Sequence, residues 1–128
     1  MISVMRIAIV EDDAQLRTVL AVFLRGMGAE VVAQSCDGQE ALEILAEGDV
    51  QPDLILTDCQ MPRLDGIPLV RRLRARGDQT PIIMISGQGD PTVRQLALAA
   101  GVNRYLDKPL SPCNLNLAII QTLPSTAA

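Results

Sequence analysis

The sequence predicts a doubly wound α/β domain, in which a parallel sheet of five strands carries helices on both faces. The main observation is that short apolar runs rich in Ile and Val alternate with longer segments whose apolar residues recur every three or four positions. Such alternation is typical of βα units that build a parallel sheet. A length of 128 residues also suits one domain. We assign the domain to residues 1–124 and a tail to residues 125–128.

Five short apolar runs are the candidate strands. Apolar residues form the centre of each run, as expected where helices cover both faces of a sheet. The first run, MRIAIV, contains Arg6 as its single charged residue, and the third ends directly before Asp58. The predicted strands span residues 5–10, 29–34, 53–57, 81–85 and 103–107.

The segments that follow these runs have the periodicity and the terminal residues of helices. Asp13 and Asp90 are placed to cap two of them, and Pro91 and Pro112 fall in first turns, where proline is tolerated. The predicted helices span residues 13–28, 37–48, 67–77, 90–101 and 111–123.

Apolar stripes on these helices identify the side chains expected to face the sheet. Leu98, Leu117 and Ile120 fall off their stripes and are expected to face outward. The arginines of the third helix are expected to form a solvated face: Arg71, Arg72, Arg74 and Arg76. The inward set is Leu16, Leu20, Phe23, Met27, Ala41, Leu42, Leu45, Leu69, Val70, Leu73, Val93, Leu96, Ala97, Ala100, Leu115 and Ile119.

Composition excludes several functional classes. The chain has no histidine, which excludes His-dependent catalytic triads and zinc sites of the usual kind. A net charge of −4 and an aromatic content of 2% disfavour direct nucleic-acid binding. The three cysteines form no CxxC pair, and no apolar run approaches the roughly 20 residues of a membrane span. We therefore expect a cytoplasmic protein that binds neither nucleic acid nor membrane.

Polar residues follow four of the five predicted strands. Parallel strands end at the same edge of a sheet, and ligands bind outside that edge, so these side chains are expected to converge. The second strand ends in Gln34 and Ser35, which suggest no site. The residues after the other strands are Glu11, Asp12 and Asp13, then Asp58, then Ser86 and Gly87, and finally Lys108 and Pro109.

The side-chain types in this set indicate phosphoryl transfer. Two like charges at 4 Å repel by about 4 kcal/mol at an effective dielectric constant of 20, so clustered carboxylates require a cation. Oxygen ligands without histidine or thiolate suit Mg²⁺, which leaves positions open for a phosphoryl group. Lys108 and Ser86 can bind phosphoryl oxygens, and Asp58 can be the nucleophile that forms an aspartyl phosphate.

Four stretches resemble those of response-regulator receiver domains, including the CheY-like single-domain regulators of chemotaxis: IVEDD, LTDCQMPRLDG, IIMISG and YLDKPL. The resemblance covers residues 5–123. It implies a flavodoxin-like (βα)5 fold with strand order 2-1-3-4-5. It also implies a two-component signalling domain, rather than an enzyme with an external substrate. A sensor histidine kinase or a histidine phosphotransfer protein would donate the phosphoryl group, from a phosphohistidine, to Asp58.

The resemblance also assigns the metal ligands. Asp12 would bind Mg²⁺ directly and Glu11 through a water molecule. Asp58 would be both a ligand and the phosphorylated residue. Gln60 would offer its backbone carbonyl.

Further roles concern the phosphoryl group and the response to it. Lys108, Ser86 and Gly87 would contact the phosphoryl oxygens. The bond between Lys108 and Pro109 would be cis. Tyr105 would be the aromatic residue that changes rotamer when Ser86 moves, although a plain core position for this tyrosine is the alternative.

Signal output would use one surface in this family, made by the fourth helix, the fifth strand and the fifth helix. Leu98, Tyr105, Leu117 and Ile120 lie there, and we expect this surface to bind a downstream target or a second copy of the chain. Two other functions stay open. One is a degenerate receiver that binds a partner without phosphorylation. The other is a Mg²⁺-dependent phosphohydrolase, which would need an acid where this chain has Gln60.

Overall fold

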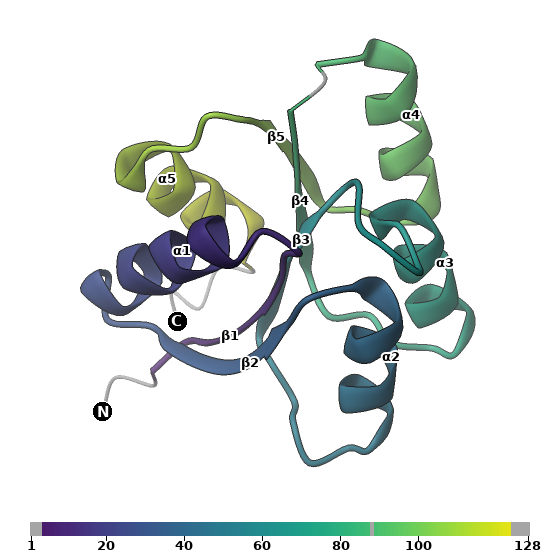
Figure 1. Ribbon diagram of the computed structural model, residues 1–128, viewed down its shortest axis with the longest axis horizontal. Helices are drawn as coiled ribbons and strands as arrows, with labels where there is room; N and C mark the ends of the chain where they lie inside the picture. The colour runs from purple at the N-terminus through teal and green to yellow at the C-terminus, as the bar shows by residue number, and fades with distance from the viewer. Residues whose placement is uncertain (1–3, 88, 124–128) are drawn as a thin grey trace.

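The computed structural model describes residues 4–87 and 89–123, in which the chain forms a five-stranded parallel sheet in the order β2-β1-β3-β4-β5 (Figure 1). The predicted fold class and strand order are therefore confirmed. The predicted tail at 125–128 lies outside the described residues. The strands are β1 (Arg6–Val10), β2 (Glu30–Ser35), β3 (Leu54–Asp58), β4 (Ile82–Ser86) and β5 (Arg104–Asp107). The helices are α1 (Ala14–Gly26), α2 (Gly38–Ala46), α3 (Gly66–Ala75), α4 (Pro91–Ala100) and α5 (Pro112–Thr122).

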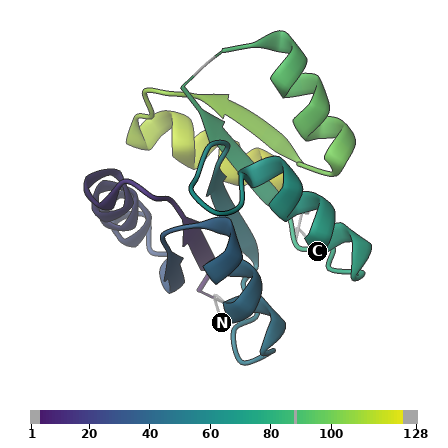
Figure 2. The same ribbon diagram turned by 45° about the vertical axis from the view of Figure 1, so that its right-hand side comes forward.

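Helices cover both faces of the sheet. α1 and α5 lie on one face, and α2, α3 and α4 lie on the other (Figures 1 and 2). Because successive residues of a strand point to opposite faces, β1 places Ile7 and Ile9 in the core beneath α1 and α5, and Ala8 and Val10 in the core beneath α2 and α3. Every residue of β3 and β4 is buried. The sheet is thus a rigid support whose strand ends can position side chains.

Side-chain caps fix where the helices begin. Asp13 accepts hydrogen bonds from the backbone N–H groups of Gln15 and Leu16, as predicted, and Asp90 accepts one from Thr92. Ser111 caps α5 in the same way. None of the helices within residues 4–87 and 89–123 is long and apolar enough to cross a bilayer.

The prediction that Leu96 faces the core is wrong, because its side chain is 46% exposed. On α4 only Ala97 is fully buried, with Val93 and Ala100 partly buried beside it. α4 packs against α3 and β5, at one end of the helical layer (Figure 2). A helix in that position has neighbours along only a narrow part of its surface, so some side chains of its apolar stripe face solvent. Leu98 is exposed, as predicted.

The prediction that the arginines of α3 form a solvated face is wrong for Arg74. Its guanidinium donates to the backbone carbonyls of Asp78, Thr80 and Gly101 at 2.8–3.2 Å. It also donates to the side chain of Asn103 at 3.0 Å. Arg74 therefore ties α3 to the turns that precede β4 and β5. Arg71, Arg72 and Arg76 are exposed.

Candidate functional site

The carboxyl edge of the sheet brings together the predicted acidic residues. Glu11 and Asp12 follow β1 directly, and Asp58 is the last residue of the neighbouring strand β3. Carboxylate oxygens of these three residues all lie within 4.8 Å of one another. Glu11 and Asp58 are buried, whereas Asp12 is exposed. The cluster therefore has a buried floor and one side chain open to solvent.

Lys108, which follows β5, reaches into this cluster. Its Nζ donates to Asp58 Oδ2 at 3.2 Å and lies 3.6 Å from Glu11 Oε1. Burial alone would lower the pKa of Lys108, but the adjacent carboxylates of Asp58 and Glu11 outweigh burial and the pKa is raised. The lysine is therefore a permanent cation at this site. One ammonium group offsets only part of the charge of three carboxylates.

Glu11 shows most clearly that the cluster fits a cation. One oxygen, Oε2, accepts the backbone N–H of Asp13 at 3.1 Å. The other, Oε1, is buried and has no hydrogen-bond partner among the described residues. Burial, and then the negative charge of Asp58, raise the pKa of Glu11 to about 8. A divalent cation would satisfy this oxygen and favour the ionised carboxylate, and oxygen-only donors are the set that Mg²⁺ prefers.

The backbone around Asp58 holds its carboxylate in place. Asp58 Oδ1 accepts the N–H of Cys59 at 2.8 Å, and the Cys59 carbonyl accepts the N–H of Gly66 at 2.8 Å. Gly66 packs so tightly here that a Cβ would collide with the Asp58 carbonyl oxygen and lie 2.9 Å from Met84 Cε. The side chain of Asp65 accepts the N–H of Met61 at 3.0 Å and makes no capping bond to α3. Loop 59–65, which joins β3 to α3, is therefore held in place at the end where it meets α3.

The ends of β4 and β5 are joined beside Asp58. The N–H of Lys108 donates to the Ser86 carbonyl at 2.8 Å, and the Lys108–Pro109 bond is cis, as predicted. Ser86 is buried, and a Cβ at Gly87 would lie 3.8 Å from Lys108 Cδ. Ser86, Gly87 and Lys108 thus lie together near the acidic cluster. The roles predicted for them, and for the Gln60 carbonyl, stay predictions.

Tyr105 is 7% exposed and belongs to the core on the α2, α3 and α4 side of the sheet. Its hydroxyl oxygen is buried without a hydrogen-bond partner in the part of the chain that the structure describes. Leu117 and Ile120 are 53% and 63% exposed, as predicted for α5. The expected output surface is therefore apolar on its helices and carries a buried tyrosine beneath.

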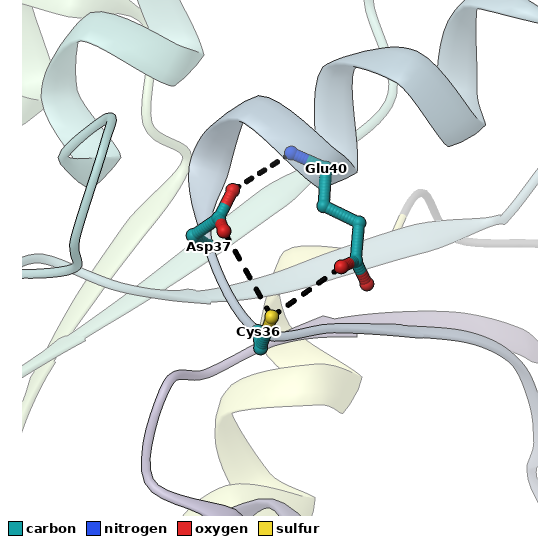
Figure 3. Close-up of side chains that lie close together, drawn as sticks. All are labelled: Cys36, Asp37 and Glu40. Atoms are coloured by element: carbon teal, nitrogen blue, oxygen red, sulfur yellow. Dashed lines mark hydrogen bonds between the residues drawn. The ribbon is translucent and has the colours of Figure 1, made fainter.

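Sequence reasoning missed a polar group after β2. Cys36, Asp37 and Glu40 lie close together at the start of α2 (Figure 3). The Cys36 thiol donates to Glu40 Oε2 at 3.3 Å, and Asp37 Oδ1 accepts the Glu40 N–H at 2.8 Å. The hydrogen bond to Glu40 is the main cause that raises the pKa of Cys36, so the thiol stays protonated.

Asp37 also pairs with Arg63, 2.9 Å away in the loop after β3. The sequence did contain a signal for Asp37: an aspartate directly before a helical pattern is typical of an N-cap residue. Nothing in the sequence indicated that Arg63, far along the chain, would reach it.

Comparison with known proteins agrees with this geometry. Residues 7–120 match the family described as the response regulator receiver domain. Regulator of RpoS from Escherichia coli (strain K12) is 39% identical over 109 residues, which are 85% of this chain and 32% of that protein. The chain spans less than half the length of the curated relatives it matches first.

Solved structures give the same result. Chemotaxis response regulator CheY4 of Vibrio cholerae superposes with a TM-score of 0.84 at 27% identity, over 94% of this chain and all of that one (100%). The receiver domain of sensor histidine kinase PA1611 from Pseudomonas aeruginosa PAO1 has a TM-score of 0.84 at 31% identity. That match covers 96% of this chain and 100% of the other, which holds a magnesium ion coordinated in its active site cleft.

Proposed function

The chain belongs to the family of response regulator receiver domains, and we propose that it accepts a phosphoryl group on Asp58 with Mg²⁺ bound beside it. The phosphodonor is a phosphohistidine of a sensor histidine kinase or a histidine phosphotransfer protein. The observation that carries the proposal is the buried Oε1 of Glu11, in a carboxylate cluster that includes Asp58: it lies 3.6 Å from the Lys108 ammonium but has no hydrogen-bond partner among the described residues. Such a cluster is costly unless a cation completes it.

Each residue has a defined part in the transfer. An oxygen of Asp58 forms a bond to phosphorus while the bond from phosphorus to the histidine nitrogen breaks, and that electron pair returns to the imidazole. Glu11, Asp12, Asp58 and the Gln60 carbonyl would hold Mg²⁺, which neutralises charge on the phosphoryl oxygens. The Lys108 ammonium, already 3.2 Å from Asp58, moves its hydrogen bond to a phosphoryl oxygen.

The hydroxyl of Ser86 and the backbone beside Gly87 would complete the phosphoryl contacts. Both residues stand at the end of β4, the strand that pairs with β3. Their place beside Lys108 supports this assignment, because the end of β4 is joined to the Lys108 backbone. Movement of Ser86 toward the phosphoryl group would change the rotamer of Tyr105, and the α4-β5-α5 surface would change with it. The output surface is Leu98, Leu117 and Ile120 with Tyr105 beneath, and Leu96 extends it.

A chain that works in this way is a phosphoacceptor and not an enzyme that turns over an external substrate. The three cysteines are unpaired, which supports a reducing, cytoplasmic location. The net charge of −4 on the chain favours protein partners over nucleic acid.

The test is phosphorylation of the full chain with acetyl phosphate, followed by intact-mass spectrometry. We expect one phosphoryl group per chain, only when Mg²⁺ is present, and its loss on treatment with hydroxylamine, which cleaves acyl phosphates. If the chain takes up no phosphoryl group from this donor or from a phosphohistidine protein, it acts as a phosphorylation-independent binding module. Continuous release of phosphate at many turnovers would instead indicate a phosphohydrolase.

A further inference from the structure

An ion pair ties the loop after Asp58 to the start of α2. Arg63 Nε donates to Asp37 Oδ2 at 2.9 Å, and Arg63 Nη2 donates to Asp37 Oδ1 at 3.2 Å. This bidentate arrangement fixes orientation as well as distance. The Asp37 side chain is 8% exposed and that of Arg63 is 58% exposed. A largely exposed arginine is thus directed onto a nearly buried carboxylate.

Asp37 is also held from the α2 side. Its Oδ1 accepts the backbone N–H of Glu40 at 2.8 Å, which makes it the N-cap of α2. The pKa of Asp37 is lowered, first by this backbone hydrogen bond and then by Arg63. The carboxylate is therefore a charged anchor with a fixed position.

Packing adds a second link between the loop and α2. Arg63 has a φ of 64°, a left-handed conformation that a residue other than glycine adopts only when its surroundings impose it. The next residue, Leu64, is 9% exposed. Gly38, in the first turn of α2, lies so close to it that a Cβ there would collide with the Leu64 carbonyl oxygen. Residues 63 and 64, the tip of the loop, therefore contact the start of α2 through an ion pair and through close packing.

Gln60 lies in the same loop, between the tip and the base. The base is fixed by Asp65, which accepts the Met61 N–H at 3.0 Å, and by the Gly66 N–H, which donates to Cys59 at 2.8 Å. Gln60 itself is exposed. The direction of its backbone carbonyl therefore depends on the two ends of the loop and not on packing of its own side chain.

We propose that Asp37 and Arg63 are positioning residues, which hold loop 59–65 in the conformation that Mg²⁺ binding requires. This inference rests on the proposed function, because it takes the Gln60 carbonyl as a metal ligand. Neither residue of the pair is among the proposed metal ligands. They act through the loop, and α2 becomes part of the support of the site.

Simple electrostatics makes a different prediction, which allows a clear test. If the charges acted directly, loss of the Arg63 cation would strengthen Mg²⁺ binding, and loss of the Asp37 anion would weaken it. If the pair positions the loop, loss of either partner weakens binding. The sign of the Arg63 effect therefore separates the two explanations.

The experiment measures Mg²⁺ affinity by isothermal titration calorimetry and the rate of labelling by acetyl phosphate, on the full chain. The variants are Arg63→Gln, Asp37→Asn and the double variant. Asn can still accept the Glu40 N–H, so the helix cap is kept. Arg71→Gln removes a cation from an exposed position of α3 and is the matched control. Circular dichroism confirms that each variant is folded.

We expect each single variant to bind Mg²⁺ about tenfold more weakly, the lower end of the range for groups that orient metal ligands. The Mg²⁺ affinity of the double variant should equal that of the more affected single variant, because both substitutions break the same ion pair. Arg63→Lys, which keeps the charge without the bidentate geometry, should recover part of the affinity. Arg71→Gln should bind as the parent does or slightly more tightly.

Arg63→Gln that binds Mg²⁺ as tightly as the parent, or more tightly, would overturn the inference and leave the proposed function intact. A parent chain that neither binds Mg²⁺ nor becomes labelled would reject the proposed function and this inference with it.

Discussion

The carboxylates of Glu11, Asp12 and Asp58 are close enough to repel, and Lys108 offsets only part of that repulsion. The structure therefore predicts opposite effects on function and stability when Asp58 is neutralised. Asp58→Asn should abolish labelling by acetyl phosphate. Without metal and above about pH 8, where Glu11 is ionised, it should also raise the melting temperature by a few degrees, because one repelling charge is gone while Lys108 keeps Glu11 as a partner.

Mass spectrometry and differential scanning calorimetry check this pair of outcomes. Asp49→Asn removes the same charge from an exposed turn and should change neither quantity. Full labelling of Asp58→Asn would show that another residue is the acceptor.

Glu11 gives the metal-free chain a definite pH dependence. Its pKa is raised from the ordinary value of 4.5 to about 8, so between these values the folded chain holds a proton that the unfolded chain has lost. As far as this group is concerned, stability without metal should therefore be highest below about pH 4.5, fall as pH rises from about 4.5 to about 8, and level off above that. Each pKa unit of difference corresponds to about 1.4 kcal/mol.

Urea unfolding between pH 5 and 8 in EDTA measures this slope. Glu11→Gln should flatten it, since no proton is exchanged at that position. Saturating Mg²⁺ should flatten or reverse it in the parent, because the cation binds the ionised carboxylate and competes with the proton. An unchanged slope in Glu11→Gln would assign the titration to a different group.

At the scale of elements, the junction between β3 and α3 is tightly packed around Gly66. Gly66→Ala should destabilise the chain by about 2–3 kcal/mol, because the new methyl group meets the Asp58 carbonyl and Met84. It should also slow labelling, since the backbone that bears Asp58 must shift. Gly26→Ala, with no atom within 4 Å of the added Cβ, should be neutral or stabilising by up to about 1 kcal/mol. Equal effects of the two substitutions in urea unfolding would contradict this explanation.

Local pattern predicted the elements well because their determinants are local. Apolar runs, and caps such as Asp13 and Asp90, placed the strands and most helix starts within a residue or two of their observed bounds. The shared edge of a parallel sheet then brought the Glu11, Asp12 and Asp58 carboxylates together without any further information.

Long-range contacts account for what the sequence did not predict. Arg74 looks like its exposed neighbours in sequence, and its role appears only when the turns before β4 and β5 fold against it. Leu96 has the right periodicity, yet no element covers its side of α4 in the part of the chain described. The Asp37–Arg63 pair likewise depends on how α2 and the β3–α3 loop meet in space.

At the scale of the whole molecule, exposed apolar side chains concentrate on two regions. Leu96, Leu98, Leu117 and Ile120 lie on α4 and α5, and Val19 and Val22 lie on α1. α4 and α5 lie on opposite faces of the sheet near its edge strand β5, whose end leads to Lys108 and the acidic cluster. Association that depends on phosphorylation should therefore use the α4 and α5 group.

Leu98→Glu combined with Ile120→Glu should weaken phosphorylation-dependent association by about tenfold or more, because two apolar contacts are lost and charges are placed in the interface. Labelling of Asp58 should be unchanged. Sedimentation velocity with and without beryllofluoride, a phosphoryl analogue, measures self-association. A pull-down under the same two conditions measures binding to a downstream target protein. Val19→Glu with Val22→Glu on α1 is the matched control. Association that survives the first double variant but not the second would place the output surface on α1.

Tyr105 lies beneath that surface, and it is the single tyrosine of a chain that has no tryptophan. Tyrosine emission therefore arises from one buried ring on β5, with no tryptophan to mask it or to accept its energy. The protein carries a built-in optical reporter at the place where the proposed site and the proposed output surface meet. A stopped-flow fluorescence trace of the unlabelled, unmodified chain would follow the environment of this one side chain in real time as a phosphodonor is added.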